Sequence, residues 1–335
     1  MNLQTKYLGL ELKSPIVVSA NPLSEKVDNI LAMEEAGAGA VVMFSLFEEQ
    51  IRREEAAYEY IYQQSTYGSA EAQDYFPDIS DFHVGIDDYL RIIQESSRQA
   101  RIPIIGSLNG ISRSGWIDYA KQIEAAGASA LEINIYYIPA NPQMDGVEVE
   151  ERYLDIVELV KEVIQIPVAI KLNPYFSALA NMAQKLDNAG ADGLVLFNRF
   201  YEPDFDIETM SLSHALELSS PSEIRLPLLW LAILHGRVGC SLAASTGVSS
   251  SKEVIKYLLA GADCAMTASA ILKHGIPFIK HMIDEIKTWM AARNFDSVDQ
   301  WKGKMSQKHM KDPTLYERAN YIKVLEEYSV PTLTK

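Results

Sequence analysis

Short apolar runs alternate with longer amphipathic segments along most of the chain. The run Val168 to Ile170 is rich in β-branched residues, is bounded by prolines and stops at Lys171. It is too short for a helix and therefore predicts a buried strand. Amphipathic helices are expected over about 86–100 and about 147–164. Eight such strands, each followed by a helix, predict a parallel sheet.

A repeated motif marks the junctions between helices and strands. The tripeptide Ala-Gly-Ala starts at Ala36, Ala126, Ala189 and Ala260, and an apolar run follows each copy. Glycine permits the left-handed conformation that ends a helix, so each copy predicts a helix end followed by a buried strand. Eight βα units in 335 residues favour a closed (β/α)8 TIM barrel over a doubly wound sheet.

Three segments do not follow this alternation. We expect residues 1–335 to form a single barrel domain that carries loop insertions at 47–85 and 199–224 and a C-terminal helical extension at 293–335. The insertions follow the second and sixth strands, so they belong to the face of a barrel where ligands bind. Near the N-terminus, Ser24 is expected to cap a helix that runs to about residue 36.

Composition narrows the class of ligand. A net charge of −15 argues against nucleic acid as a partner, because phosphate contacts need a basic surface. No apolar run approaches the ~18–20 residues of a membrane span, and the first residues do not resemble a signal peptide. The two cysteines, Cys240 and Cys264, lie in apolar segments, as in reduced core thiols. We therefore expect a cytoplasmic protein without a membrane partner, and composition leaves both a small ligand and a protein partner open.

Polar residues stand where the predicted strands end. The carboxyl ends of barrel strands converge on one site, and Lys171 is the charged residue among these ends. Its alternative role is that of a lysine reaching from a strand end to water. Four asparagines also stand at these ends, and together with the lysine this set suits a planar heterocycle with several carbonyls and ring nitrogens: Asn109, Asn134, Asn173 and Asn198.

The last two loops predict a phosphate site. The segment 244–248 is small and polar and precedes the seventh helix, and Ala268-Ser269 opens the eighth. Backbone N–H groups at such positions favour an anion, as in many barrels after strands seven and eight. Ordinary capping of these helices by serine is the alternative.

Several of these motifs resemble the dihydroorotate dehydrogenase family. The segment Ile170 to Phe176 is similar to the family's lysine strand, and 131–135 to its asparagine-bearing fourth strand. Residues 14–20 resemble its first strand and 218–221 a Leu-Ser-Gly-Pro loop. Residues 245–248 match the family's Gly-Gly-Ile phosphate loop, and residues 268–270 match its Gly-Thr-Ala phosphate loop. The order of these motifs along the chain supports the resemblance.

The resemblance implies an FMN-dependent oxidoreductase of pyrimidine biosynthesis, in which dihydroorotate or a related small cyclic substrate transfers hydride to the flavin. Lys171 would stabilise negative charge on the reduced ring. The asparagines named above would bind substrate. The implied flavin contacts are Ser19, Ala20, Ser45, Asn134, Lys171, Asn198, Ser220, Ser245, Thr246, Gly247, Ala268 and Ser269. Independently, the six histidines show no metal-ligand spacing with cysteines or carboxylates, so no metal site is expected.

Two departures from the family pattern concern the reaction. Tyr137 stands at the position where the family has a Cys or Ser as the active-site base. A phenol of pKa about 10 is a poor base at neutral pH. Tyr137 is therefore either an unusual catalytic residue or a wall of the site. Phe44 stands where the family has a lysine on its second strand, which removes a charge.

Two other function classes remain. The chain could be a catalytically divergent barrel that binds a partner, or a Schiff-base lyase that uses Lys171 as the amine. For the oxidoreductase, the expected partners are a small-molecule substrate and either a second copy of the chain in a homodimer or a redox partner protein.

Overall fold

The computed structural model describes residues 1–53, 86–199, 202–213, 217–317, 321–322 and 325–326. Eight parallel strands form a closed barrel, because β4 pairs with β6 as well as with β3. The predicted TIM barrel is confirmed. Around the barrel the strands are β4 (Ala40–Val42), β3 (Ile16–Val18), β13 (Cys264–Thr267), β12 (Ser241–Ala244), β9 (Gly193–Leu196), β8 (Val168–Leu172), β7 (Ala130–Asn134) and β6 (Ile104–Asn109).

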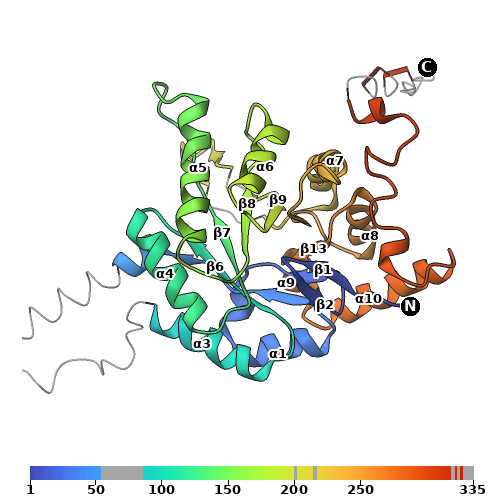
Figure 1. The fold of residues 1–335 in the computed structure, drawn as a ribbon, viewed down its shortest axis with the longest axis horizontal. Helices are drawn as coiled ribbons and strands as arrows, with labels where there is room; N and C mark the ends of the chain where they lie inside the picture. The colour runs from blue at the N-terminus through green and yellow to red at the C-terminus, as the bar shows by residue number, and fades with distance from the viewer. Residues whose placement is uncertain (54–85, 200–201, 214–216, 318–320, 323–324, 327–335) are drawn as a thin grey trace, which may run out of the picture.

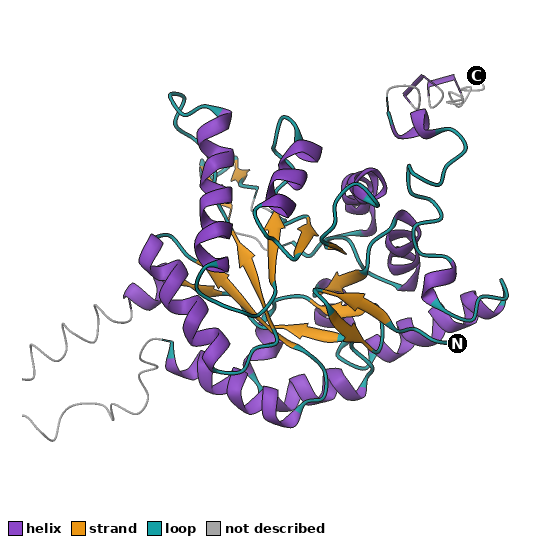
Figure 2. Cartoon of the chain, viewed as in Figure 1, coloured by secondary structure: helices purple, strands orange, loops and turns teal. Residues whose placement is uncertain are grey.

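Helices cover the outside of the barrel (Figures 1 and 2). Their apolar faces pack on the strands, which are buried on both sides as expected for parallel strands. The glycines of the repeated motif adopt positive φ as predicted, for example +117° at Gly261 after α8. The helices are α1 (Val27–Glu35), α3 (Asp87–Gln99), α4 (Arg113–Ala125), α5 (Gly146–Lys161), α6 (Leu179–Asn188), α7 (Arg225–Leu234), α8 (Ser251–Ala260), α9 (Ser269–His274) and α10 (Phe278–Ala291).

An N-terminal hairpin closes one end of the barrel. Strands β1 (Thr5–Tyr7) and β2 (Leu10–Leu12) pair in antiparallel register. Tyr7, Leu8 and Leu12 are buried and pack with apolar side chains of the barrel lumen such as Val17 and Val195. This packing fills the lumen from the N-terminal ends of the strands, so a ligand site is left at their C-terminal ends.

Ser24 does not have the predicted role. Asn21 caps a short 3-10 helix, η1 (Pro22–Glu25), and its side chain accepts the N–H of Leu23. Ser24 lies inside η1, where its buried hydroxyl donates to the carbonyl of Asn21 and accepts the N–H of Phe44. Proline favours the first position of such a turn. The longer helix α1 therefore begins only after Lys26, which makes no side-chain capping bond.

The segments outside the βα alternation are described only in part. Residues 54–85, most of the first predicted insertion, lie outside the described residues, while β5 (Leu46–Phe47) at its start pairs with β6. The second insertion carries a hairpin of β10 (Asp204–Asp206) and β11 (Ser211–Ser213), followed by η3 (Pro221–Ile224). Residues 293–317 contain the short 3-10 helices η4 (Val298–Gln300) and η5 (Pro313–Tyr316). No helix among the described residues is long and apolar enough to cross a membrane.

Candidate active site

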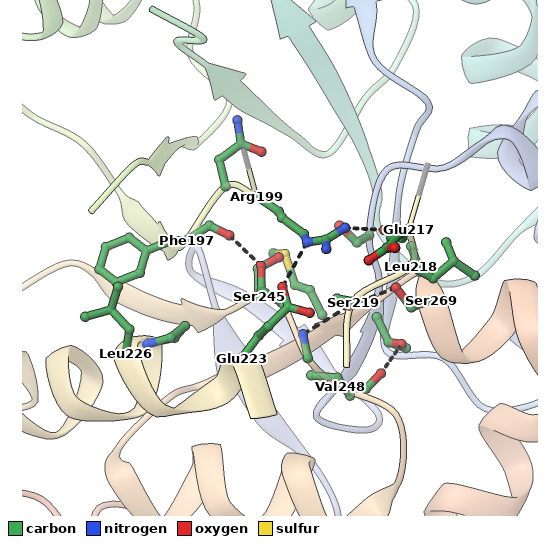
Figure 3. Close-up of a pocket in the computed structure, with 18 of the residues that line it drawn as sticks. Phe197, Arg199, Glu217, Leu218, Ser219, Glu223, Leu226, Ser245, Val248 and Ser269 are labelled. Carbon is green, nitrogen blue, oxygen red and sulfur yellow. Dashed lines mark hydrogen bonds and ion pairs between the residues drawn. The ribbon is translucent and has the colours of Figure 1, made fainter. Parts of the chain in front are cut away.

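The main cavity, of about 790 Å³, opens at the C-terminal ends of β3, β8, β9, β12 and β13 (Figure 3). Strands far apart in the sequence bring the predicted residues together there because the parallel barrel places all these ends on one rim. The cavity lies in the size range of small-molecule and cofactor sites. The predicted residues that line it are Ser19, Ala20, Lys171, Asn198, Ser245, Thr246, Gly247, Ala268 and Ser269.

A buried ion pair underlies one side of this cavity. Lys171 is 8% exposed, and its Nζ lies 3.2 Å from Oε1 of Glu132, which is 1% exposed. Asn134 pairs directly with Lys171 in the sheet register. Sequence reasoning missed Glu132. The period of two along a strand places it on the same face as Asn134, and this signal could have identified it.

The opposite side of the main cavity is built from serine and glycine. The Ser219 and Ser269 hydroxyls are 2.9 Å apart, and the Gly247 N–H donates to Ser219 Oγ at 3.2 Å. Thr246 and Gly247 both have positive φ, +78° and +74°. A Cβ at Gly247 would lie 2.6 Å from Ile224 Cγ2 and 2.9 Å from the Ser220 carbonyl oxygen. The local backbone path therefore requires glycine at this position.

Arg199 holds both ends of the loop that carries Ser219. Its Nε lies 2.8 Å from Oε2 of Glu223, and its Nη1 donates to the carbonyl of Glu217 (Figure 3). The other oxygen of Glu223 accepts the Ser220 N–H in a capping box at the start of η3. Ser220 thus caps a helix, while its neighbour Ser219 faces the cavity. The path of the loop decides which of the two serines faces the cavity, and the sequence carried no signal for that choice.

A second, smaller cavity of about 280 Å³ lies beside the first. Asn109 is 5% exposed, and neither polar atom of its side chain has a hydrogen-bond partner among the described residues. Asn134 also lines this cavity, and its Oδ1 accepts a 2.8 Å hydrogen bond from Asn198 in the main cavity. The other lining residues are Phe47, Glu49, Gly110, Ile111, Trp116, Ile135, Tyr136, Tyr137, Arg152 and Ile156.

Tyr137 faces the second cavity instead of the main one. Its hydroxyl donates to Met144 Sδ at 3.1 Å, and the Arg152 guanidinium lies 4.2 Å from its ring centroid. A cation over an aromatic ring is a stabilising arrangement. These contacts orient Tyr137 as a wall of the second cavity in this conformation.

Three predicted site residues line neither cavity. Ser45 pairs its hydroxyl with that of Ser107 at 3.0 Å, and Ser220 takes part in the cap of η3. Asn173 donates to the Tyr153 hydroxyl at 2.7 Å and accepts the Tyr175 N–H at 2.8 Å. Burial raises the pKa of Tyr153 to about 12, although its bond with Asn173 acts in the opposite direction. Asn173 therefore shapes the loop after β8 in this structure.

Comparison with known proteins gives one consistent result. The family model described as dihydroorotate dehydrogenase matches residues 82–290. The proteins named dihydroorotate dehydrogenase B (NAD(+)), catalytic subunit, from Thermoplasma acidophilum and Methanocaldococcus jannaschii are 23% and 24% identical to this chain. These matches cover 90% and 87% of the chain and 98% and 94% of the two relatives. The Bacillus pumilus protein of the same name is 28% identical over 62% of the chain and 68% of its own length.

Proposed function

The chain belongs to the dihydroorotate dehydrogenase family of flavin-dependent oxidoreductases, and from this premise we propose that it oxidises dihydroorotate or a related small cyclic substrate with FMN as the cofactor. One observation carries the proposal. A buried lysine and a serine–glycine cradle lie in a single cavity at the C-terminal mouth of the barrel. That pairing suits a ligand with an electron-rich ring at one end and a phosphate at the other.

The residues of the main cavity fit FMN in type and position. Ser219, Gly247 and Ser269 line the cavity with hydroxyl and backbone groups, which suits a phosphate. At the other side, Ser19, Ala20 and Lys171 would border the ring. The bound flavin would supply the acceptor for hydride. The role of Lys171 is to place a cation beside the ring when negative charge develops on it.

The second cavity supports a place for the substrate. In the part of the chain that the structure describes, the buried side chain of Asn109 has an unused donor and an unused acceptor. Such groups are costly unless a ligand or water completes them. Asn134 borders the same cavity and is oriented by Asn198. We expect these amides to orient a ring with adjacent carbonyl and N–H groups.

The role of Tyr137 separates the oxidoreductase from a divergent binding protein. As a base, its hydroxyl would have to leave Met144 and reach the substrate; as a wall, it would keep its present contacts. Phe44 packs edge-on against Tyr89 with ring centroids 4.9 Å apart, so the position of the family's second lysine is filled by core packing. Retention of flavin without turnover would favour the divergent binding protein.

The visible spectrum of the purified protein tests the proposal. We expect a yellow protein, or a colourless one that becomes yellow on addition of FMN, with bleaching when dihydroorotate is added without oxygen. A chain that stays colourless in FMN would contradict the flavin assignment. The Schiff-base alternative predicts instead that borohydride traps a substrate adduct on Lys171, which mass spectrometry detects.

The acceptor of the electrons is a separate question. The names of the relatives include the words catalytic subunit, which supports a redox partner protein for this chain. A homodimer is the other assembly proposed. Light scattering measures the mass of the assembly, for the chain purified alone and for the chain purified from its native cells. A homodimer has twice the mass of the chain in both samples, whereas a second subunit appears only in the sample from native cells.

A further inference from the structure

Glu132 forms an ion pair with the predicted flavin lysine. It lies on β7, next to β8 in the barrel, and its Oε1 is 3.2 Å from Lys171 Nζ. The carboxylate is 1% exposed and the lysine 8% exposed, so water screens neither charge well. The two side chains therefore act as a unit whose charges largely cancel.

The surroundings of Glu132 leave Lys171 as its compensating charge. Its second oxygen, Oε2, is buried and has no hydrogen-bond partner among the described residues. The lumen below the pair is apolar, with Tyr7, Val195 and Met266 in the packed cluster. A carboxylate in such surroundings is costly unless a cation balances it. A purely structural pair would be expected to satisfy both oxygens, and among the described residues this one does not.

We propose that Glu132 is a positioning residue that holds Lys171 toward the flavin and offsets its charge, which lowers the reduction potential of the bound cofactor. This inference rests on the proposed function. Reduction places negative charge on the flavin ring, and a nearby cation stabilises that charge while a nearby anion opposes it. Lys171 therefore contributes less to stabilising the reduced ring than an unpaired lysine would.

The pair has two further consequences for the site. Phe44 brings no charge to the rim, so the Glu132–Lys171 pair sets the local charge at this side of the main cavity. Arg199, the other cation that lines the cavity among the described residues, is bound to Glu223. Glu202, Asp204 and Glu217 also line this cavity, so its described lining holds no excess of positive charge to stabilise a reduced ring. This favours a reduced flavin that passes its electrons on readily.

The test is the reduction potential of the flavin-loaded protein, measured against a reference dye, in wild type and Glu132→Gln. Glutamine keeps the size of the side chain and removes its charge. We expect the equilibrium to move toward reduced flavin at least tenfold, which is about 30 mV for a two-electron couple. Sulfite, whose adduct with oxidised flavin also places negative charge on the ring, should bind at least tenfold more tightly to the variant.

The double variant Glu132→Gln/Lys171→Met controls for structural damage. It removes one charge of each sign, so its potential should return toward that of wild type, whereas damage to the site would not be reversed. Should Glu132→Gln fail to fold, Glu132→Asp keeps the charge but lengthens the contact and should shift the potential in the same direction by less. A flavin-loaded Glu132→Gln with unchanged or lower potential overturns the inference alone. Failure of wild type to bind flavin overturns the proposed function itself.

Discussion

The side-chain amide of Asn198 donates a hydrogen bond of 2.8 Å to Oδ1 of Asn134, and this bond joins the two cavities at the mouth of the barrel. Asn198 follows β9 and lines the main cavity, while Asn134 ends β7 and lines the second. The bond spans β8, the strand that carries Lys171. The positions proposed for cofactor and substrate are thus connected through a pair of amides.

Asn198→Ala should weaken substrate binding without releasing the flavin. The substitution removes the group that fixes the Asn134 amide, and a lost hydrogen bond of this kind costs about 1 kcal/mol, roughly fivefold in affinity. Titration of the flavin-loaded protein with orotate, followed by the visible spectrum, measures the effect. Asn188→Ala, at the exposed end of α6, is the matched control. Unchanged orotate affinity in Asn198→Ala would contradict this role.

Arg152 should distinguish ligands with a carboxylate from those without one. It lines the second cavity with its guanidinium over Tyr137. Orotate and uracil differ by one carboxylate, so Arg152→Gln should weaken orotate binding by roughly 10- to 100-fold, as for a charge-assisted bond, and leave uracil binding unchanged. Calorimetry with both ligands provides the measurement. Arg98→Gln, at an exposed position of α3, should change neither affinity; equal losses for both ligands would exclude a carboxylate contact.

Gly247→Ala should disrupt the phosphate cradle. The new methyl group meets Ile224 and the Ser220 carbonyl, and a φ of +74° is unfavourable for alanine. The combined strain of about 1–3 kcal/mol should lower FMN affinity by roughly tenfold or more. Gly146→Ala is a suitable control, because nothing lies within 4 Å of a Cβ at that position. Fluorescence of free FMN during dialysis reports the affinity, and equal retention by both variants would argue against the cradle.

Glu48 should make the fold sensitive to acid. Burial alone would raise the pKa of its carboxyl, but hydrogen bonds from the Ser112 hydroxyl and from the Ile111 and Ser112 N–H groups, with the charge of Arg52, hold that pKa below its usual value. The folded state then binds fewer protons than the unfolded state. The contribution of Glu48 to the free energy of unfolding is complete above the unfolded-state pKa of about 4.3. It is lost as pH falls through the pKa of the folded state.

Urea unfolding at several pH values between neutral and acid tests this effect. Glu48→Gln should lower the free energy of unfolding at pH 7 by about 1–3 kcal/mol, because it removes hydrogen bonds to a charged group. It should also flatten the decline of stability below the unfolded pKa. Glu49→Gln, at the exposed neighbouring position, should preserve the wild-type profile. A Glu48→Gln profile as steep as wild type would assign the acid sensitivity to other groups.

The barrel and the location of its site were predictable because they depend on local patterns. The apolar run before Lys171 and the glycine at positions such as Gly261 specify strand and helix ends, and parallel strands must place those ends on one rim. The predicted lysine and the residues of the last two loops accordingly line one cavity. The predicted capping role of Ser24 was wrong because Asn21 and Pro22 start a separate short turn that includes Ser24. Which of two adjacent turns forms depends on packing against the barrel.

The sequence by itself determined the fold and the rim on which the chemistry lies, because periodicity and helix-ending glycines act over a few neighbouring residues. Only the tertiary structure decided that Ser219 rather than Ser220 faces the main cavity, and that Asn109 and Tyr137 border a second one. It also decided that Glu132 forms a buried ion pair with Lys171. These relationships depend on the path of loops and on contacts across strands distant in the sequence, which no local pattern encodes.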